Sequence, residues 1–108
     1  NVAAINYMAQ ALKAGDGVAQ DLEQSFALFS KTANAGNPMG LLEVSKAFAS
    51  GDGTAVDLVK AHLHANLAAT RGLNEATELR QALTEQMSIE DVLVAQQMAR
   101  DWVAVELK

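Results

Sequence analysis

Two histidines are the side chains in this sequence best suited to hold a metal ion. His62 and His64 stand two positions apart, and on a helix of 3.6 residues per turn they point about 200° away from each other. They therefore cannot bind one metal ion without ligands from other elements. A more ordinary arrangement is expected, in which one histidine lies at a helix–helix contact and the other faces solvent.

Carboxylates next to glycine-rich segments are a second candidate for chemistry. The four aspartates concerned are Asp16, Asp21, Asp52 and Asp57. Their spacing does not match a calcium loop, which needs several oxygen ligands and a distal glutamate. The segment Gly15-Asp16-Gly17 also lacks the preceding strand and the third glycine of a dinucleotide-binding turn. Turn and N-cap roles explain all four aspartates, so no metal and no cofactor is predicted.

Nucleophilic catalysis finds no support either. The sequence has no cysteine, and its serines lie outside any nucleophile-elbow pattern and have no suitably spaced histidine. No set of acid, base and nucleophile converges in the sequence. We therefore predict that the chain is not an enzyme.

Composition narrows the class of protein further. The chain has 108 residues, of which 50% are apolar and 19% are charged, which fits one folded domain. Eight basic against thirteen acidic residues give a net charge of −5, which disfavours nucleic acid and anionic membrane surfaces as partners. No apolar run reaches the roughly 20 residues of a membrane-spanning helix. The absence of cysteine does not assign a compartment, so cytoplasm and periplasm both stay open.

An internal repeat organises the chain. The segment 15–22 (GDGVAQDL) reappears as 51–58 (GDGTAVDL), an offset of 36 residues. Ala33 and Gly36 recur as Ala69 and Gly72 at the same offset. Met87 stands where a third Gly-Asp-Gly would begin, so the pattern stops there. This predicts one repeat domain over 1–108, with full units at 1–36 and 37–72, a partial unit at 73–86 and a closing helix at 88–106.

Residues typical of helix ends divide each unit into helices. Asn37-Pro38 reads as an N-cap followed by the first helical residue, and Gly51 stands where a left-handed C-cap belongs. Helices are expected over 2–14, 21–35, 38–50, 57–71, 74–86 and 88–106, with Ala4, Met8 and Leu12 as an apolar stripe on the first. The expected fold is all-α: a superhelical α/α solenoid of antiparallel helix pairs.

These residues resemble the Sel-one-like repeat (SLR) family, a branch of the tetratricopeptide-type solenoids. The resemblance covers residues 1–86. It is carried in the first unit by Ala4, Met8, Leu12, Gly15-Asp16-Gly17-Val18, Asp21, Ala33 and Gly36. In the second unit it is carried by Gly40, Val44, Phe48, Gly51-Asp52-Gly53, Asp57, Ala68-Ala69 and Gly72. Leu12, Gly40 and Thr54 depart from the family pattern. The segment 87–102, which ends in Trp102, looks like the closing helix of bacterial members.

The resemblance implies a scaffold or adaptor that binds a protein or peptide segment on a concave face lined by the first helix of each pair. Carrying over the family's inner positions gives Asn6, Gln10, Lys13, Leu42, Lys46, Ala49, Glu78, Ala82 and Glu85. An ordinary solvated helix face explains the same residues equally well. If the face binds an acidic partner, charge reversal at Lys13 and Lys46 is expected to weaken binding without lowering the melting temperature.

The first helix opens with apolar residues, and no polar capping helix precedes them. Val2, Ile5 and Tyr7 are the residues concerned, whereas repeat arrays usually end in a polar cap. We therefore expect this surface to pack on upstream repeats of a longer protein, of which this chain is the C-terminal part, or on another copy of the chain. The alternative function is accordingly a structural cap or self-association element, as a homodimer or through end-to-end packing.

Overall fold

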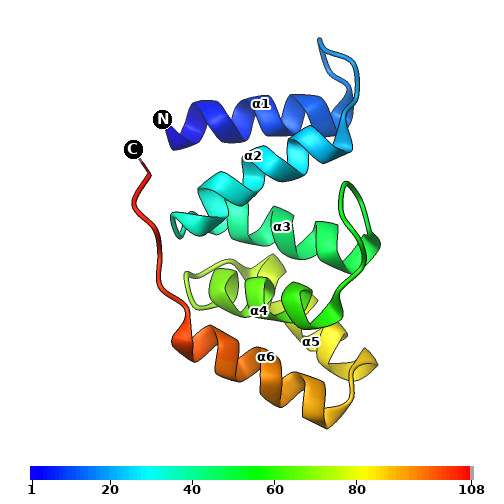
Figure 1. The fold of residues 1–108 in the computed structure, drawn as a ribbon, viewed down its shortest axis with the longest axis vertical. Helices are drawn as coiled ribbons and strands as arrows, with labels where there is room; N and C mark the ends of the chain where they lie inside the picture. Colours follow the sequence, from blue (N-terminus) through cyan, green and yellow to red (C-terminus); the bar gives the residue numbers. More distant parts are fainter. Residues whose placement is uncertain (108) are drawn as a thin grey trace.

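The computed structural model describes residues 1–107, which form six helices and no strand. The helices are α1 (Val2–Ala14), α2 (Leu22–Asn34), α3 (Pro38–Ser50), α4 (Leu58–Ala69), α5 (Asn74–Gln86) and α6 (Ile89–Asp101). They stack into an elongated body of 42 × 26 × 22 Å with α1 at one end and α6 at the other (Figure 1). The predicted all-α solenoid of helix pairs is confirmed, and no described helix is long and apolar enough to cross a membrane.

Each helix pair closes through the loop that the repeat predicted. In the first unit Gly15 caps α1 in the left-handed conformation, with φ of 72°. The Asp21 N–H then donates to the Leu12 carbonyl at 2.9 Å, and the Asp21 side chain caps α2. The same three features recur 36 residues later in the loop between α3 and α4. This loop returns the chain to the helix it has just left, so the second helix packs antiparallel to the first.

A buried serine ties the two helices of each full unit together. In the first unit the Ser25 hydroxyl of α2 donates to the Ala9 carbonyl of α1 at 2.7 Å. In the second unit the Ser45 hydroxyl of α3 donates to the Ala61 carbonyl of α4 at 2.6 Å. Ser45 occupies the repeat position of Ala9, and Ala61 that of Ser25. The same cross-helix bond is therefore made twice with donor and acceptor exchanged.

Neighbouring units meet where the second helix of one unit crosses the first helix of the next. At the α2–α3 crossing, a Cβ added to Gly40 would overlap the Thr32 hydroxyl and the backbone nitrogen of Ala33. At the α4–α5 crossing the corresponding residue is Ala76, which is fully buried. Its Cβ is accommodated there, and the repeat counterpart of Thr32 is Ala68, which has no hydroxyl. The residue at this position thus sets how closely two units approach.

The predicted apolar stripe of α1 is buried only in part. Leu12 is buried, but Ala4 and Met8 are exposed, and the buried alanine is Ala9. The reason is that α2 covers one side of α1. In α3 and α5 the opposite side is covered by the second helix of the preceding unit, and on α1 that side faces solvent.

The closing helix is shorter than predicted. It ends at Asp101, and Trp102 follows as an extended C-cap residue instead of lying within a helix to 106. From there the chain runs back along the stack toward the N-terminus (Figure 1). The Val105 N–H donates to the Asn34 carbonyl at the end of α2 at 2.6 Å, and the Arg71 guanidinium lies 5.3 Å from the Trp102 ring centroid. These partners for an extended backbone and an indole replace further helical turns.

A methyl group at Gly40 is expected to destabilise the fold. Gly40→Ala should gain about 1 kcal/mol of helix propensity, but the overlap with Thr32 and the α2 backbone should lower the free energy of unfolding by about 1–3 kcal/mol overall. Urea unfolding followed by circular dichroism measures the change. A Gly40→Ala variant more stable than the parent chain would show that α2 and α3 do not approach this closely.

Candidate functional site

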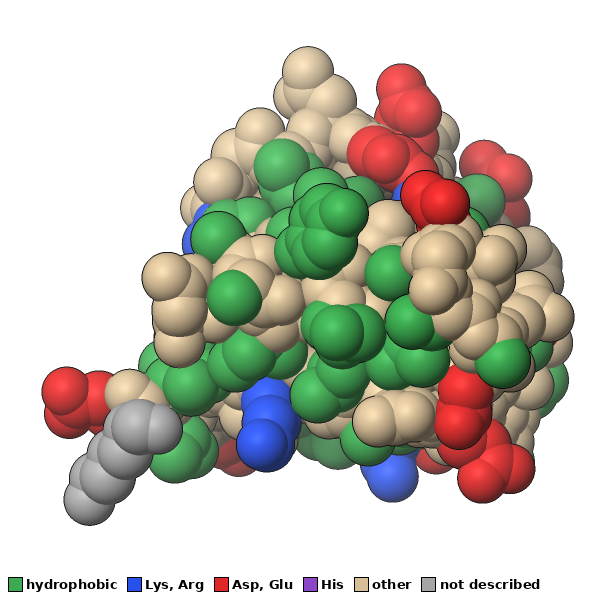
Figure 2. Space-filling model, turned by 90° about the horizontal axis from the view of Figure 1, so that it is seen from above, with side chains coloured by type: hydrophobic (Ala, Val, Ile, Leu, Met, Phe, Trp, Pro, Cys, Tyr) green, Lys and Arg blue, Asp and Glu red, His purple; other side chains and the backbone are tan. Residues whose placement is uncertain are grey.

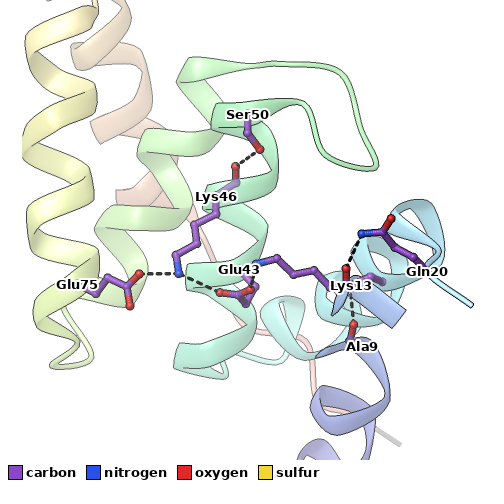
Figure 3. A network of polar contacts seen from close by, with 8 residues as sticks. Ala9, Lys13, Gln20, Glu43, Lys46, Ser50 and Glu75 are labelled. Carbon is purple, nitrogen blue, oxygen red and sulfur yellow. Dashed lines mark hydrogen bonds and ion pairs between the residues drawn. The ribbon is translucent and has the colours of Figure 1, made fainter. Parts of the chain in front are cut away.

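An ion-pair ladder crosses the first helices of all three units. It consists of Lys13 on α1, Glu43 and Lys46 on α3, and Glu75 on α5 (Figure 3). The Lys13 Nζ lies 2.7 Å from Glu43 Oε1, and the Lys46 Nζ lies 3.3 Å from Glu43 Oε2. Lys46 also reaches Glu75 Oε2 at 2.5 Å. The four charges therefore alternate in sign from one end of the α1–α3–α5 face to the other.

Glu43 is the centre of this ladder and is nearly inaccessible to solvent. Its side chain is 7% exposed, whereas those of Lys13 and Lys46 are 38% and 36% exposed. A buried carboxylate is tolerated only when it is paired and hydrogen-bonded, and each oxygen of Glu43 has a lysine. The adjoining cavity of about 30 Å³, walled by Ser25, Phe26 and Phe29 among others, is too small for anything much larger than water.

The environment of Lys46 strengthens its positive charge. Partial burial would lower the pKa of the ammonium group, because it removes water from the charged form. Hydrogen bonds and charges from Glu75 and Glu43 outweigh that effect and raise the pKa of Lys46 above its ordinary value. Lys46 is thus a permanent cation whose charge is already balanced by carboxylates within the protein.

The residues predicted to line a binding face fall into three groups. Gln10, Glu78, Ala82 and Glu85 are exposed. Lys13, Lys46 and Ala49 are partly exposed, the two lysines as members of the ladder. Asn6 and Leu42 lie inward: Leu42 is buried, and Asn6 accepts a hydrogen bond from the Thr32 hydroxyl at 2.7 Å and donates to the Asn37 side chain at 2.9 Å.

Sequence reasoning missed the role of Glu43. Its i, i+3 spacing to Lys46 was visible in the sequence, but such pairs usually lie on the surface and stabilise little. The burial of Glu43 arises from the approach of α2, which no local pattern shows. The ladder also changes the expectation for charge reversal at Lys13 or Lys46, because either reversal would set a carboxylate against buried Glu43 and destabilise the protein.

His62 is the histidine that lies at a helix–helix contact, as predicted for one of the two. It is buried on α4, with Nε2 3.0 Å from the hydroxyl of Thr84 on α5. That hydroxyl donates to the Arg80 carbonyl at 2.8 Å, so Nε2 carries the proton and Nδ1 is a buried acceptor without a partner among the described residues. Burial, and then the charge of Arg80, lowers the pKa of His62.

His64 is not free in solvent, contrary to expectation. It is partly buried, stacks 5.6 Å from the Phe48 ring centroid, and has Nδ1 2.7 Å from the Lys60 carbonyl. Burial lowers its pKa although the hydrogen bond to that carbonyl opposes the shift. Among the described residues, no group of three or more histidine, aspartate or glutamate side chains is placed to hold a metal ion.

Removing the cations of the ladder is expected to expose the cost of burying Glu43. The double variant Lys13→Met with Lys46→Met should lose about 1–3 kcal/mol of unfolding free energy, because the Glu43 carboxylate then stays buried without a cation. Adding Glu43→Gln should restore most of that loss, since the neutral amide has a smaller desolvation penalty. Urea unfolding of the three variants tests this. A triple variant no more stable than the double would contradict the role given to Glu43.

Acid is expected to destabilise the α4–α5 contact through His62. Because the folded-state pKa lies below the ordinary value of about 6.5, the unfolded chain binds the proton first as the pH falls. The contribution of His62 to stability should therefore be constant above about pH 6.5 and decline below it. His62→Phe, which installs the residue found at the same position of the first unit (Phe26), should flatten part of the protein's decline in stability. His64→Gln should flatten another part, because the pKa of His64 is lowered as well, and the double variant should flatten the decline more than either single variant. Urea midpoints at neutral and mildly acidic pH measure it.

Comparison with known proteins bears on the fold. No family model matches the sequence, and no curated protein matches it significantly. A solved structure does: a protective antigen of uropathogenic Escherichia coli strains that displays an SLR fold superposes with a TM-score of 0.90 at 23% sequence identity. The match covers 94% of this chain but 22% of the antigen. The arrangement of helices described above is therefore that of an SLR solenoid.

Proposed function

We propose that the chain is a non-enzymatic scaffold that binds a protein or peptide segment on its first-helix face. This face comprises the accessible residues of α1, α3 and α5 that the family resemblance selected. They are Gln10, Lys13, Lys46, Ala49, Glu78, Ala82 and Glu85. SLR-fold repeats commonly mediate protein interactions, and the shared fold supports this reading. The antigenic role of the structural neighbour belongs to a much longer chain and is not carried over.

The observation that carries the proposal is the ion-pair ladder. It joins α1, α3 and α5 through Glu43 and Lys46, so the three helices that form the face are held in one register. A surface already in its binding arrangement loses little conformational entropy on association. The ladder thus supplies a preorganised face along the stack.

The charges of the face point to a partner segment with a basic end. Lys13 and Lys46 are balanced by Glu43 and Glu75 within the protein, so they offer little net attraction to an acidic partner. Glu78 and Glu85 on α5 are exposed, and no described cation lies within ion-pair distance of either. Electrostatic complementarity across an interface then favours lysine or arginine in the part of the partner that lies over α5.

Charge reversal on α5 tests the proposed face. Affinity capture from a bacterial extract with the parent chain should retain specific proteins that the double variant Glu78→Lys with Glu85→Lys loses by about tenfold or more. Both residues are exposed, so the fold should stay intact.

The matched control is Glu23→Lys with Glu106→Lys, which makes the same change in net charge at exposed positions of α2 and of the extended segment after α6. This control should retain the captured proteins. Equal loss in both double variants would assign binding to overall charge, and equal retention would place it on another surface; either result overturns the proposed face.

A second function, a structural or self-association element, is favoured by a different observation. The outer side of α1 carries exposed apolar side chains, including Tyr7 and Met8. This surface lies at the end of the stack (Figure 1).

A further inference from the structure

The α1 end of the molecule carries an exposed apolar surface. Hydrophobic side chains gather across the middle of this end in Figure 2. Tyr7 is 79% and Met8 is 46% exposed, and Ala3 and Ala4 beside them are exposed as well. These four residues are called the α1 face, which is a different surface from the first-helix face along the stack. Apolar side chains scattered singly are ordinary on a protein surface, but a contiguous group on one helix indicates an interaction site.

The repeat shows what kind of element fits the α1 face. The counterparts of Ala4 and Met8 in the second unit are Gly40 and Val44, and both are buried where α2 packs on α3. The counterpart of Ala4 in the third unit, Ala76, is buried where α4 packs on α5. Every first helix after α1 is thus covered on this side by a second-type helix, which is the second helix of the preceding unit. The same side of α1 carries small and apolar residues like those of such a contact, and no described residue covers it.

The loop after α1 also lacks the neighbouring helix that its counterpart in the second unit has. In the second unit, Gly53 packs so closely on the start of α2 that an added Cβ would overlap the Leu22 carbonyl. Its counterpart in the first unit, Gly17, has no neighbouring atom within 4 Å of such a Cβ. The N-terminal end of a second-type helix would therefore lie over the Gly17 loop, with the rest of that helix running antiparallel to α1.

A helix with a suitable surface lies at the opposite end of the molecule. On α6, Ile89 is 67%, Leu93 is 55% and Val94 is 50% exposed, and these three residues are called the α6 face. The helix packs on α4 through its other side, where Val92 and Ala95 are buried. Because α1 and α6 lie at opposite ends of the long axis (Figure 1), one molecule cannot bring its own two faces together.

Charge favours contact between unlike ends. α1 carries one charged side chain, Lys13, in its last turn, while α6 carries Glu90 and Asp91 in its first turn. Pairing two α6 helices would bring acidic residues together. Like charges at an interface oppose association, so the contact of α6 with α1, which carries no carboxylate, is favoured over the contact of two α6 helices.

We propose that the chain self-associates head to tail, with the α6 face of one copy covering the α1 face of the next. The contact would imitate the way α2 covers α3 within one chain. An interface between two different surfaces is heterologous, and a translation along the stack does not close it into a ring. Copies would therefore form open-ended rows that grow with protein concentration.

Two single substitutions test this in combination. Met8→Lys places a charge on the α1 face, and Leu93→Lys places one on the α6 face; both sites are exposed, so the melting temperature of each monomer should stay within about 3 °C. By sedimentation velocity over a wide concentration range, the parent chain should form species larger than dimers, and each variant alone should be monomeric. An equimolar mixture should form dimers and nothing larger, because each pair retains one intact α6 face and one intact α1 face.

The matched control is Gln81→Lys, which adds the same charge at an exposed position of α5 and should associate like the parent chain. A parent chain that stays monomeric at every concentration overturns the proposal. So does a Leu93→Lys variant that still dimerises, since that result assigns the interface to α1 pairing with α1. Glu78 and Glu85 are untouched in all these variants, so loss of self-association leaves the proposed first-helix face separately testable.

Discussion

The close crossing of each second helix over the next first helix is the constraint on which the rest of the structure depends. At α2 and α3 the approach leaves no room for a Cβ on Gly40. The same approach covers position 43, so its side chain is buried and, being a carboxylate, has to be paired. Lys13 and Lys46 supply the two cations. The electrostatics of the first-helix face therefore follow from backbone packing beneath it.

The parts of the fold that sequence reasoning predicted well are those decided within a few residues. A left-handed glycine ends α1 and α3, and an aspartate caps α2 and α4, because helix termini need partners for their free backbone groups wherever they occur. These signals recur at the 36-residue offset, so the order of the helices was predictable, and the bounds of the first five were predictable to within two residues at each end; α2 and α4 are shorter than the expected 21–35 and 57–71. The SLR resemblance then supplied the stacking of pairs that local signals alone do not specify.

Burial is what the sequence could not reveal, because it depends on which neighbour covers a position. Tyr7 and Glu43 occupy the same place in consecutive units, yet the aromatic ring is exposed and the carboxylate is buried. Residue hydrophobicity alone predicts the reverse. The end of α6 was missed for a related reason: the extended residues after Trp102 find partners on α2 and at Arg71, far away in sequence. The accessible part of the candidate site therefore had to come from the structure.

The first-helix face and the two end faces are separate surfaces, so partner binding and self-association can occur together. The first-helix face runs along the stack, whereas the α1 and α6 faces close its two ends (Figure 1). Growth of a row through the ends would leave the first-helix face open and lengthen it. Each copy would contribute a nearly neutral stretch over α1 and α3, where the ladder balances its own charges, followed by the carboxylates of Glu78 and Glu85. A partner with regularly spaced basic residues could then contact several copies at once, and its avidity would rise with the length of the row without any new kind of contact.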